Sequence, residues 1–209
     1  MADIVIVIGN KNTSSWSLRG WLALKATGAA FEEINVRLSR PETKAEILSH
    51  GGGPTVPILK HKGTVVWETL AICEFLAESY PAAGLWPKAA EARALARSVA
   101  AEMHAGFAAL RANMPMDMRA RKPGTGLADG VQANIDRISA IWRQCRERYG
   151  EGGPYLFGGF SAADAMFAPV VSRFVTYAPR LDAVSAAYRD ALWRWPAMQE
   201  WYEGARREA

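Results

Sequence analysis

The sequence predicts a small α/β unit over residues 1–80, followed by a region that is entirely helical. A continuous run of β-branched residues at 4–8, then a helical pattern and a second strand pattern, gives a βαβ unit. A strand, a turn, a strand and a helix follow as a ββα unit. From residue 91 onward no strand pattern of any strength appears. With 209 residues, half of them hydrophobic, the chain can bury one large core or two smaller ones.

The elements of the α/β unit follow from local patterns of apolar, capping and breaking residues. In chain order we expect a strand at 4–8, a helix from 14 to 28, a strand at 31–36, a short helix near 42–48, strands at 55–60 and 64–67, and a helix from 68 to about 80. Pro57 falls inside the third strand pattern, where a proline removes a hydrogen-bond donor from the ladder. A cis peptide bond between Val56 and Pro57 would reconcile the proline with that position.

The helical region is predicted from apolar residues that recur three and four positions apart. One set steps along a single helical face: Leu95, Val99, Met103, Phe107, Leu110 and Met114. Further helices are expected at 131–149, from 161, at 182–193 and at 196–206. We therefore divide the chain into a domain at 1–80, a linker at 81–90 and a helical domain at 91–209.

Composition argues against several classes of protein. The net charge of +4 is spread along helices, so we expect no nucleic-acid partner. The apolar run at 4–8 is far shorter than the ~20 residues of a membrane span, so we expect no membrane partner. Two distant cysteines indicate core thiols in a reducing cytoplasm, and the spacing of the three histidines does not suggest a metal site. We expect a cytoplasmic protein without metal.

Two glycine-rich motifs lack the context that their chemistry needs. Residues 50–53 (HGGG) resemble a lipase oxyanion-hole sequence, but no G-x-S-x-G nucleophile motif is present. Residues 124–126 (GTG) lie in a polar stretch without the preceding strand of a dinucleotide site. Hydrolase and nucleotide-binding functions are therefore not supported.

The strongest candidate site is the junction at Ser14, where the first strand is followed by a helix. In α/β sheets, ligands bind at the carboxyl ends of strands and against helix N-termini, which favour anions such as a thiolate. The alternative is that Ser14 and Ser15 only cap the helix. Two other features favour a ligand site: the Val56 backbone before Pro57 can pair with an extended peptide, and Glu68 and Thr69 can hold an ammonium and a carboxylate.

Taken together, these motifs resemble the glutathione transferase family over nearly the whole chain. The resemblance rests on five segments in the family's order: SSWSLR at 14–19, WLAL at 21–24, VPIL at 56–59, ETLAI at 68–72 and FSAAD at 160–164. It implies a thioredoxin-like domain followed by an all-helical one, with the serine-type site of the zeta and tau classes. The zeta-class isomerases carry a cysteine where this chain has Trp16.

The resemblance also implies roles for individual residues. Ser14 matches the catalytic serine that hydrogen-bonds the glutathione sulfur, and the basic residue for the glycyl carboxylate is expected at Lys44. The full set expected to bind glutathione is Ser15, Trp16, Lys44, Val56, Pro57, Glu68 and Thr69. Whether Ser15 or Asn12 shares the role of Ser14 is left open. The resemblance further implies a homodimer that uses glutathione as co-substrate.

The electrophile pocket is expected between Ser14 and the first helices of the second domain. Its candidate residues are Met103, His104, Phe107 and Arg111. His104 and Arg111 are seven residues apart on one helical face and can orient an anionic substrate, although a solvated helix face explains them equally well.

The resemblance therefore predicts a glutathione transferase whose thiolate attacks small hydrophobic electrophiles. Two alternatives remain: a glutathione-dependent isomerase similar to maleylacetoacetate isomerase, and a non-catalytic binding or regulatory protein with the same fold.

Overall fold

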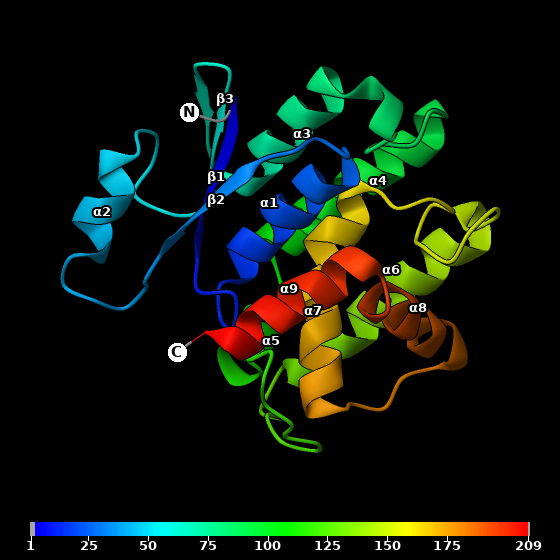
Figure 1. Ribbon diagram of the computed structural model, residues 1–209. Coiled ribbons are helices and arrows are strands. Elements are labelled where there is room, and N and C mark those ends of the chain that lie inside the picture. Colours follow the sequence, from blue (N-terminus) through cyan, green and yellow to red (C-terminus); the bar gives the residue numbers. More distant parts are fainter. Residues whose placement is uncertain (1–2, 209) are drawn as a thin grey trace.

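The computed structural model describes residues 3–208. A four-stranded sheet is built by the first third of the chain, and helices follow (Figure 1). The elements are β1 (Ile4–Gly9), α1 (Ser15–Ala26), β2 (Glu32–Val36), α2 (Thr43–Ser49), β3 (Ile58–His61), β4 (Thr64–Val66), α3 (Thr69–Ser79), a 3-10 turn η1 (Pro81–Ala83), α4 (Ala90–Ala105), α5 (Ala108–Asn113), α6 (Val131–Tyr149), α7 (Ala162–Tyr177), α8 (Ala183–Trp193) and α9 (Pro196–Arg207).

The sheet has the strand order β2-β1-β3-β4, with β1 in its interior. β1 pairs in parallel with β2, as a βαβ unit requires, and antiparallel with β3. Five of its six residues are buried, which agrees with the prediction of a strand covered on both faces. The βαβ-ββα order predicted from the sequence is confirmed.

Helices cover the sheet unequally. Figure 1 shows α1 and α3 together on one side of the sheet, whereas α2 stands alone on the other. On the α2 side a small core forms from Val7, Val36, Ile47, Val56 and Ile58. On the α1 side the core continues without a break into the helical region.

The helical region is joined to the sheet unit mainly through α1, which packs against α7. The buried Arg19 of α1 adds a polar link, because its Nε donates to the carbonyl oxygen of Met166 in α7 at 2.8 Å. Trp21 of α1 and Trp201 of α9 also meet, with ring centroids 5.4 Å apart. These contacts place the start of α1 directly beside the helical region.

Two predicted elements were wrong in detail. The strand expected at 55–60 begins only at Ile58, so Pro57 precedes the ladder and removes no donor from it. The helical face expected to run from Leu95 to Met114 is interrupted after Ala105, where Phe107 adopts a left-handed φ of 64°. Gly106 permits this break, since a Cβ there would lie 2.8 Å from the Glu102 carbonyl oxygen.

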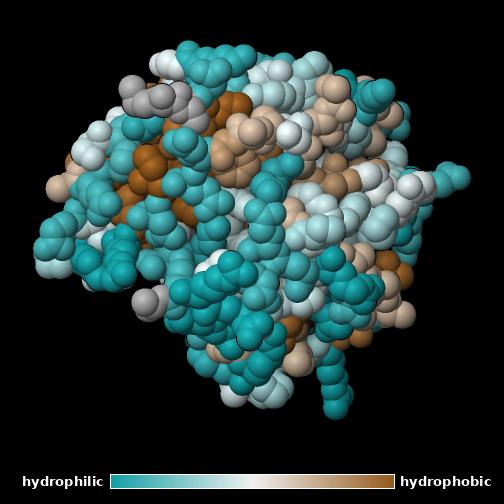
Figure 2. Space-filling view, in the orientation of Figure 1, coloured by the Kyte–Doolittle hydropathy of each residue, from teal (hydrophilic) through white to brown (hydrophobic). Residues whose placement is uncertain are grey.

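The face of the molecule in Figure 2 is mostly polar, and a hydrophobic patch lies over the sheet. Val5, Ile34 and Val65 line a hollow of about 470 Å³ on the sheet beyond the cover of α2. Among the helices of residues 3–208, none is long and apolar enough to cross a membrane.

Candidate functional site

Ser14 caps the N-terminus of α1 and is connected by hydrogen bonds to the end of β1. Its side-chain oxygen accepts from the Ser17 N–H at 3.4 Å, and its hydroxyl donates to Ser17 Oγ at 2.7 Å. Ser17 Oγ in turn accepts from the Gly9 N–H at 2.9 Å. A short hydrogen-bonded chain therefore links the end of β1 through Ser17 to Ser14, and both of its ends donate to Ser17 Oγ.

This chain can supply a hydrogen bond to an anion. A serine hydroxyl is both donor and acceptor, and its hydrogen rotates to suit its partners. When an anion lies against Ser14, the Ser17 hydroxyl can donate to Ser14 Oγ, which frees the Ser14 hydrogen for the anion. The Gly9 N–H still donates to Ser17 in that arrangement, and successive donors in such a chain strengthen one another. The sequence analysis assigned no role to Ser17.

The first turn of α1 also favours negative charge. The first amides of a helix lack intrahelical acceptors and carry the positive end of its dipole. No acidic residue stands in the first turn of α1 to neutralise it. Ser14 is only 7% exposed, which keeps water from screening this field.

Five residues of the predicted glutathione site meet in one pocket of about 110 Å³. They are Trp16, Val56, Pro57, Glu68 and Thr69, and Thr55 completes the lining. The expected cis peptide bond between Val56 and Pro57 is present. Thr69 is buried, and its hydroxyl donates to the Trp16 carbonyl oxygen at 3.5 Å, which joins the start of α3 to α1.

Glu68 is bound on both carboxylate oxygens. Oε1 accepts from the Leu70 N–H at 2.9 Å, which makes Glu68 the N-cap of α3. Oε2 lies 2.5 Å from Nε2 of His104, at the end of α4. His104, expected in the electrophile pocket, therefore contacts a residue expected to bind glutathione.

Two arginines surround the Trp16 indole. Arg19 lies 4.5 Å and Arg111 5.0 Å from its ring centroid, measured from the guanidinium carbons, and the His104 ring is 5.0 Å away. Arg111 also donates to the carbonyl oxygens of Gly106, Met103 and His104. Burial lowers the pKa of Arg111. This wall of the site is cationic and comes mainly from the helical region.

Arg19 is a buried cation to which the sequence analysis gave no role. Burial first, and then the nearby Arg111 and Arg173, lower its pKa. Its Nη1 donates to the Ser15 carbonyl oxygen at 3.1 Å, while its Nη2 has no partner among the described residues. An arginine in an otherwise apolar helix was the only sign of it in the sequence.

Other predicted residues lie away from this pocket. Lys44 is exposed on α2 and does not line it, so its role stays a prediction. Met103 is fully buried and Phe107 is 7% exposed, and both belong to the core. Asn12 directs both ends of its amide at the segment after α5, with Nδ2 3.1 Å from Asp117 Oδ1 and Oδ1 3.1 Å from the Arg119 N–H.

The protein's own thiols are not reactive groups. Cys73 and Cys145 are both buried and unpaired, and burial raises the pKa of each to about 12. Within residues 3–208, no three His, Cys, Asp or Glu side chains are grouped so that they could hold a metal ion. A thiolate at this site must therefore come from a ligand.

Comparisons with known proteins agree with this geometry. The family model described as "Glutathione S-transferase, N-terminal domain" matches residues 13–79, and the one for the C-terminal domain of the same family matches residues 127–204. The chain is 33% identical over 163 residues to a probable maleylacetoacetate isomerase of Caenorhabditis elegans, which covers 77% of this chain and 74% of that relative.

Solved structures show the same fold over almost the full length. A glutathione transferase homolog from Burkholderia with bound glutathione is 26% identical, with a TM-score of 0.74 and coverage of 98% of this chain and 99% of that one. A bacterial maleyl pyruvate isomerase of the zeta class, at 20% identity, has a TM-score of 0.73 with the same coverage.

Proposed function

The chain belongs to the glutathione S-transferase family, whose members are glutathione transferases, and we propose that it uses Ser14 to hold the glutathione thiol as a thiolate. The observation that carries this proposal is the hydrogen-bonded chain that links the Gly9 N–H through Ser17 Oγ to the Ser14 hydroxyl. It ends at the helix start, two residues before Trp16, which lines the pocket.

Glutathione would lie across the pocket as an extended peptide. The Val56 backbone pairs with the cysteinyl residue, while Glu68 and Thr69 hold the γ-glutamyl ammonium and carboxylate. Ser15 and Trp16 flank the sulfur, and Lys44 is the proposed partner of the glycyl carboxylate. The bound glutathione in the Burkholderia homolog supports this ligand.

The activation energy involved is modest and within reach of this site. A free thiol has a pKa near 8.5, and lowering it by two units requires about 2.7 kcal/mol of preferential interaction with the thiolate. Hydrogen bonds to charged groups contribute about 1.5–3 kcal/mol each, and the helix dipole adds about 0.3–1 kcal/mol. One donated bond from Ser14 together with the helix start therefore suffices.

The reaction proceeds by nucleophilic attack. The thiol proton leaves to water, the sulfur lone pair forms a bond to an electrophilic carbon, and the leaving group departs with the electrons of the broken bond. Arg111 provides positive charge beside Trp16, where it orients an anionic group of the electrophile together with the neighbouring His104. Hydrophobic electrophiles pack against Trp16.

A glutathione-dependent isomerase is the second candidate, favoured by the curated relative and the cationic wall. In that reaction the thiolate adds to the substrate, a bond rotates, and elimination returns glutathione unchanged. Trp16 stands where the zeta class has a cysteine, which favours conjugation. Counting glutathione before and after turnover separates the two reactions, because only conjugation consumes it.

The test of the proposed site is the ionisation of bound glutathione. Ultraviolet difference titration follows thiolate absorbance against pH in the wild-type protein, in Ser14→Ala and in the control Ser98→Ala, at an exposed serine of α4. We expect a depressed thiol pKa that rises only in Ser14→Ala. Binding without any depression in the wild type would instead support a non-catalytic binding protein.

The domain boundaries, a homodimer, a cytoplasmic location, a role in detoxification and the absence of a metal cofactor also belong to this proposal. Light scattering on the purified chain tests the dimer, since a monomer has a mass of 22.8 kDa.

A further inference from the structure

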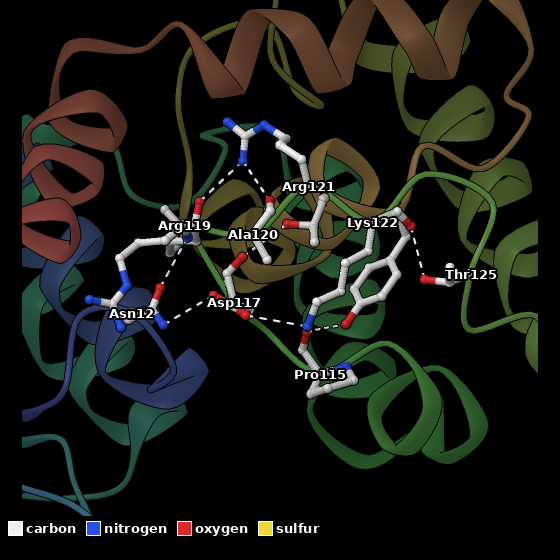
Figure 3. A network of polar contacts seen from close by, with 11 residues as sticks. Asn12, Pro115, Asp117, Arg119, Ala120, Arg121, Lys122 and Thr125 are labelled. Carbon is white, nitrogen blue, oxygen red and sulfur yellow. Dashed lines mark hydrogen bonds and ion pairs between the residues drawn. The ribbon is translucent and has the colours of Figure 1, made fainter.

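Asn12 lies in the tight turn that connects β1 to Ser14, and its side chain is directed away from the pocket. Figure 3 shows it pointing toward Asp117 and Arg119 on the segment that follows α5. Its Nδ2 donates to Asp117 Oδ1 at 3.1 Å, and its Oδ1 accepts from the Arg119 N–H at 3.1 Å. The side chain is 7% exposed. Both ends of the amide are therefore hydrogen-bonded to this segment of the helical region.

The backbone of the same turn is bound to the helical region as well. The Asn12 carbonyl oxygen accepts from the Met118 N–H at 3.2 Å. The Asn12 N–H donates to Glu208 Oε2 at 2.9 Å, and the Lys11 carbonyl oxygen accepts from Trp201 Nε1 at 2.8 Å. The turn is therefore positioned by contacts from distant parts of the chain.

Asp117, the partner of Asn12, is itself fixed by α7. Its carbonyl oxygen accepts from the Thr176 hydroxyl at 3.1 Å, and its Oδ2 lies 3.4 Å from Lys122 Nζ. The Lys122 N–H donates to the Thr176 carbonyl oxygen at 2.7 Å. Because α7 also packs against α1, the bond between Asn12 and Asp117 closes a ring of contacts. The ring runs from the turn through Asp117 and α7 to α1 and back to the turn.

The turn transmits the position of Asn12 to Ser14. The Thr13 and Ser14 N–H groups both donate to the Asn10 carbonyl oxygen, at 3.2 and 2.8 Å. Because these bonds hold the turn together, a displacement of Asn12 moves Ser14 relative to Ser17. We infer that Asn12 is a positioning residue for Ser14 and acts through its hydrogen bond to Asp117. This inference rests on the proposed role of Ser14.

A charge exchange tests this bond. In Asn12→Asp two carboxylates face each other, and repulsion between like charges displaces the turn. Asp117→Asn leaves an amide oxygen to accept from Asn12 and removes only the long, partly exposed contact with Lys122, so it should be nearly neutral. In the double variant Asn12→Asp/Asp117→Asn, the new amide donates to the new carboxylate and restores the bond with its direction reversed. Asn113→Asp, on an exposed asparagine of α5, is the control for added negative charge.

We expect Asn12→Asp to lower kcat by about 10- to 100-fold, as small misplacements of reacting groups do. The pKa of the bound glutathione thiol should rise, while KM for glutathione changes by less than about twofold, because the pocket residues are untouched. We expect kcat and the thiol pKa to remain close to the wild-type values in three variants: Asp117→Asn, Asn113→Asp and the double variant. A purely structural role would lower the melting temperature without moving the thiol pKa.

Two results would overturn the inference: a folded Asn12→Asp with wild-type kcat and thiol pKa, or a double variant no better than Asn12→Asp alone. If Asn12→Asp does not fold, Asn12→Ala removes the same bonds without adding charge and must show the same change in thiol pKa. Ser14→Ala is titrated in parallel. If Ser14→Ala raises the thiol pKa and the Asn12 variants do not, only this inference fails. If Ser14→Ala leaves the thiol pKa unchanged, the proposed function fails, and the inference fails with it.

Discussion

His104 at the end of α4 and Glu68 at the start of α3 lie 2.5 Å apart between Nε2 and Oε2. The contact joins the helical region to the carboxylate proposed to hold the glutathione ammonium. His104 also lies against Trp16, with ring centroids 5.0 Å apart. Under the proposed function, this contact joins the glutathione site to the electrophile site.

Removing His104 should weaken glutathione binding more than it slows the chemistry. Without the imidazole, the Glu68 carboxylate is held only by the Leu70 N–H, and it becomes less ordered. We expect His104→Ala to raise KM for glutathione about fivefold, equivalent to ~1 kcal/mol, with kcat within about twofold. His104→Gln, which keeps a donor, should stay near the wild type. An unchanged KM in His104→Ala would show that the contact plays no part in binding.

Removing the Ser17 hydroxyl should raise the pKa of the bound glutathione thiol. Ser17→Ala breaks the link between the Gly9 N–H and Ser14, so no hydroxyl remains to donate to Ser14 Oγ when the Ser14 hydrogen turns to the thiolate. We expect the pKa to rise by about 0.5–1 unit, equivalent to ~0.7–1.4 kcal/mol, and the pH–rate profile of kcat/KM to move to higher pH. The Gly9 N–H is left unsatisfied, which should cost about 1–3 kcal/mol of unfolding free energy. A lower stability with an unmoved thiol pKa would contradict the relay.

The two cysteines should make no contribution to the thiolate signal. Burial raises the pKa of Cys73 and Cys145 to about 12, so both remain protonated at every pH where glutathione ionises. The double variant Cys73→Ala/Cys145→Ala should titrate like the wild type when glutathione is bound. Alkylation of the wild type by iodoacetamide should require denaturant. Rapid labelling of the folded protein would show that one of them is accessible.

Asp164 should be essential to the stability of α7 without taking part in the reaction. Its carboxylate accepts from the Leu156 and Ser161 N–H groups and from the Ser161 and Tyr188 hydroxyls. An amide cannot accept from all four, so Asp164→Asn should lower the unfolding free energy by about 2–3 kcal/mol. Urea titration measures the loss. The thiol pKa of glutathione bound to the folded variant should be unchanged.

The same residue predicts a pH dependence of stability. Burial raises the pKa of Asp164 in the folded protein, although its hydrogen bonds oppose the shift. The folded state then binds more protons than the unfolded state between the two pKa values. The stabilisation that comes from this proton uptake is therefore complete below the unfolded pKa of Asp164 and is lost as the pH rises through its folded pKa, whereas the four hydrogen bonds to the carboxylate are kept. The unfolding free energy of both proteins should be measured by urea titration at a series of acidic pH values. Asp164→Asn should lack the part of the pH dependence that comes from Asp164.

Local patterns in the sequence predicted the elements that depend on neighbouring residues. The buried strand predicted at 4–8, the cis bond before Pro57 and the helix that begins after Ser161 are all present in the structure. Much of the pocket was also predicted, because Val56 and Glu68 each follow from a local motif. The prediction of one continuous helical face from Leu95 to Met114 was wrong. The apolar spacing continues through Gly106, although α4 ends at Ala105 and α5 begins at Ala108.

Contacts over long distances in the chain were not predictable in this way. Ser17 looks like an ordinary polar residue near a helix start, and only the approach of Gly9 gives it a partner. Asn12 meets Asp117 across 105 positions. His104 was expected beside the electrophile, and its contact with Glu68 depends on how α4 packs against α3. Each of these follows from tertiary packing.

Titration of glutathione bound to wild-type protein and to Ser14→Ala decides whether Ser14 activates the thiol. The account predicts a wild-type thiol pKa well below its free value near 8.5 and a rise of at least about one unit in Ser14→Ala, equivalent to ~1.4 kcal/mol. Glutathione should bind both proteins with similar affinity. Equal thiol pKa values in the two proteins would show that Ser14 only caps the helix and would contradict the account.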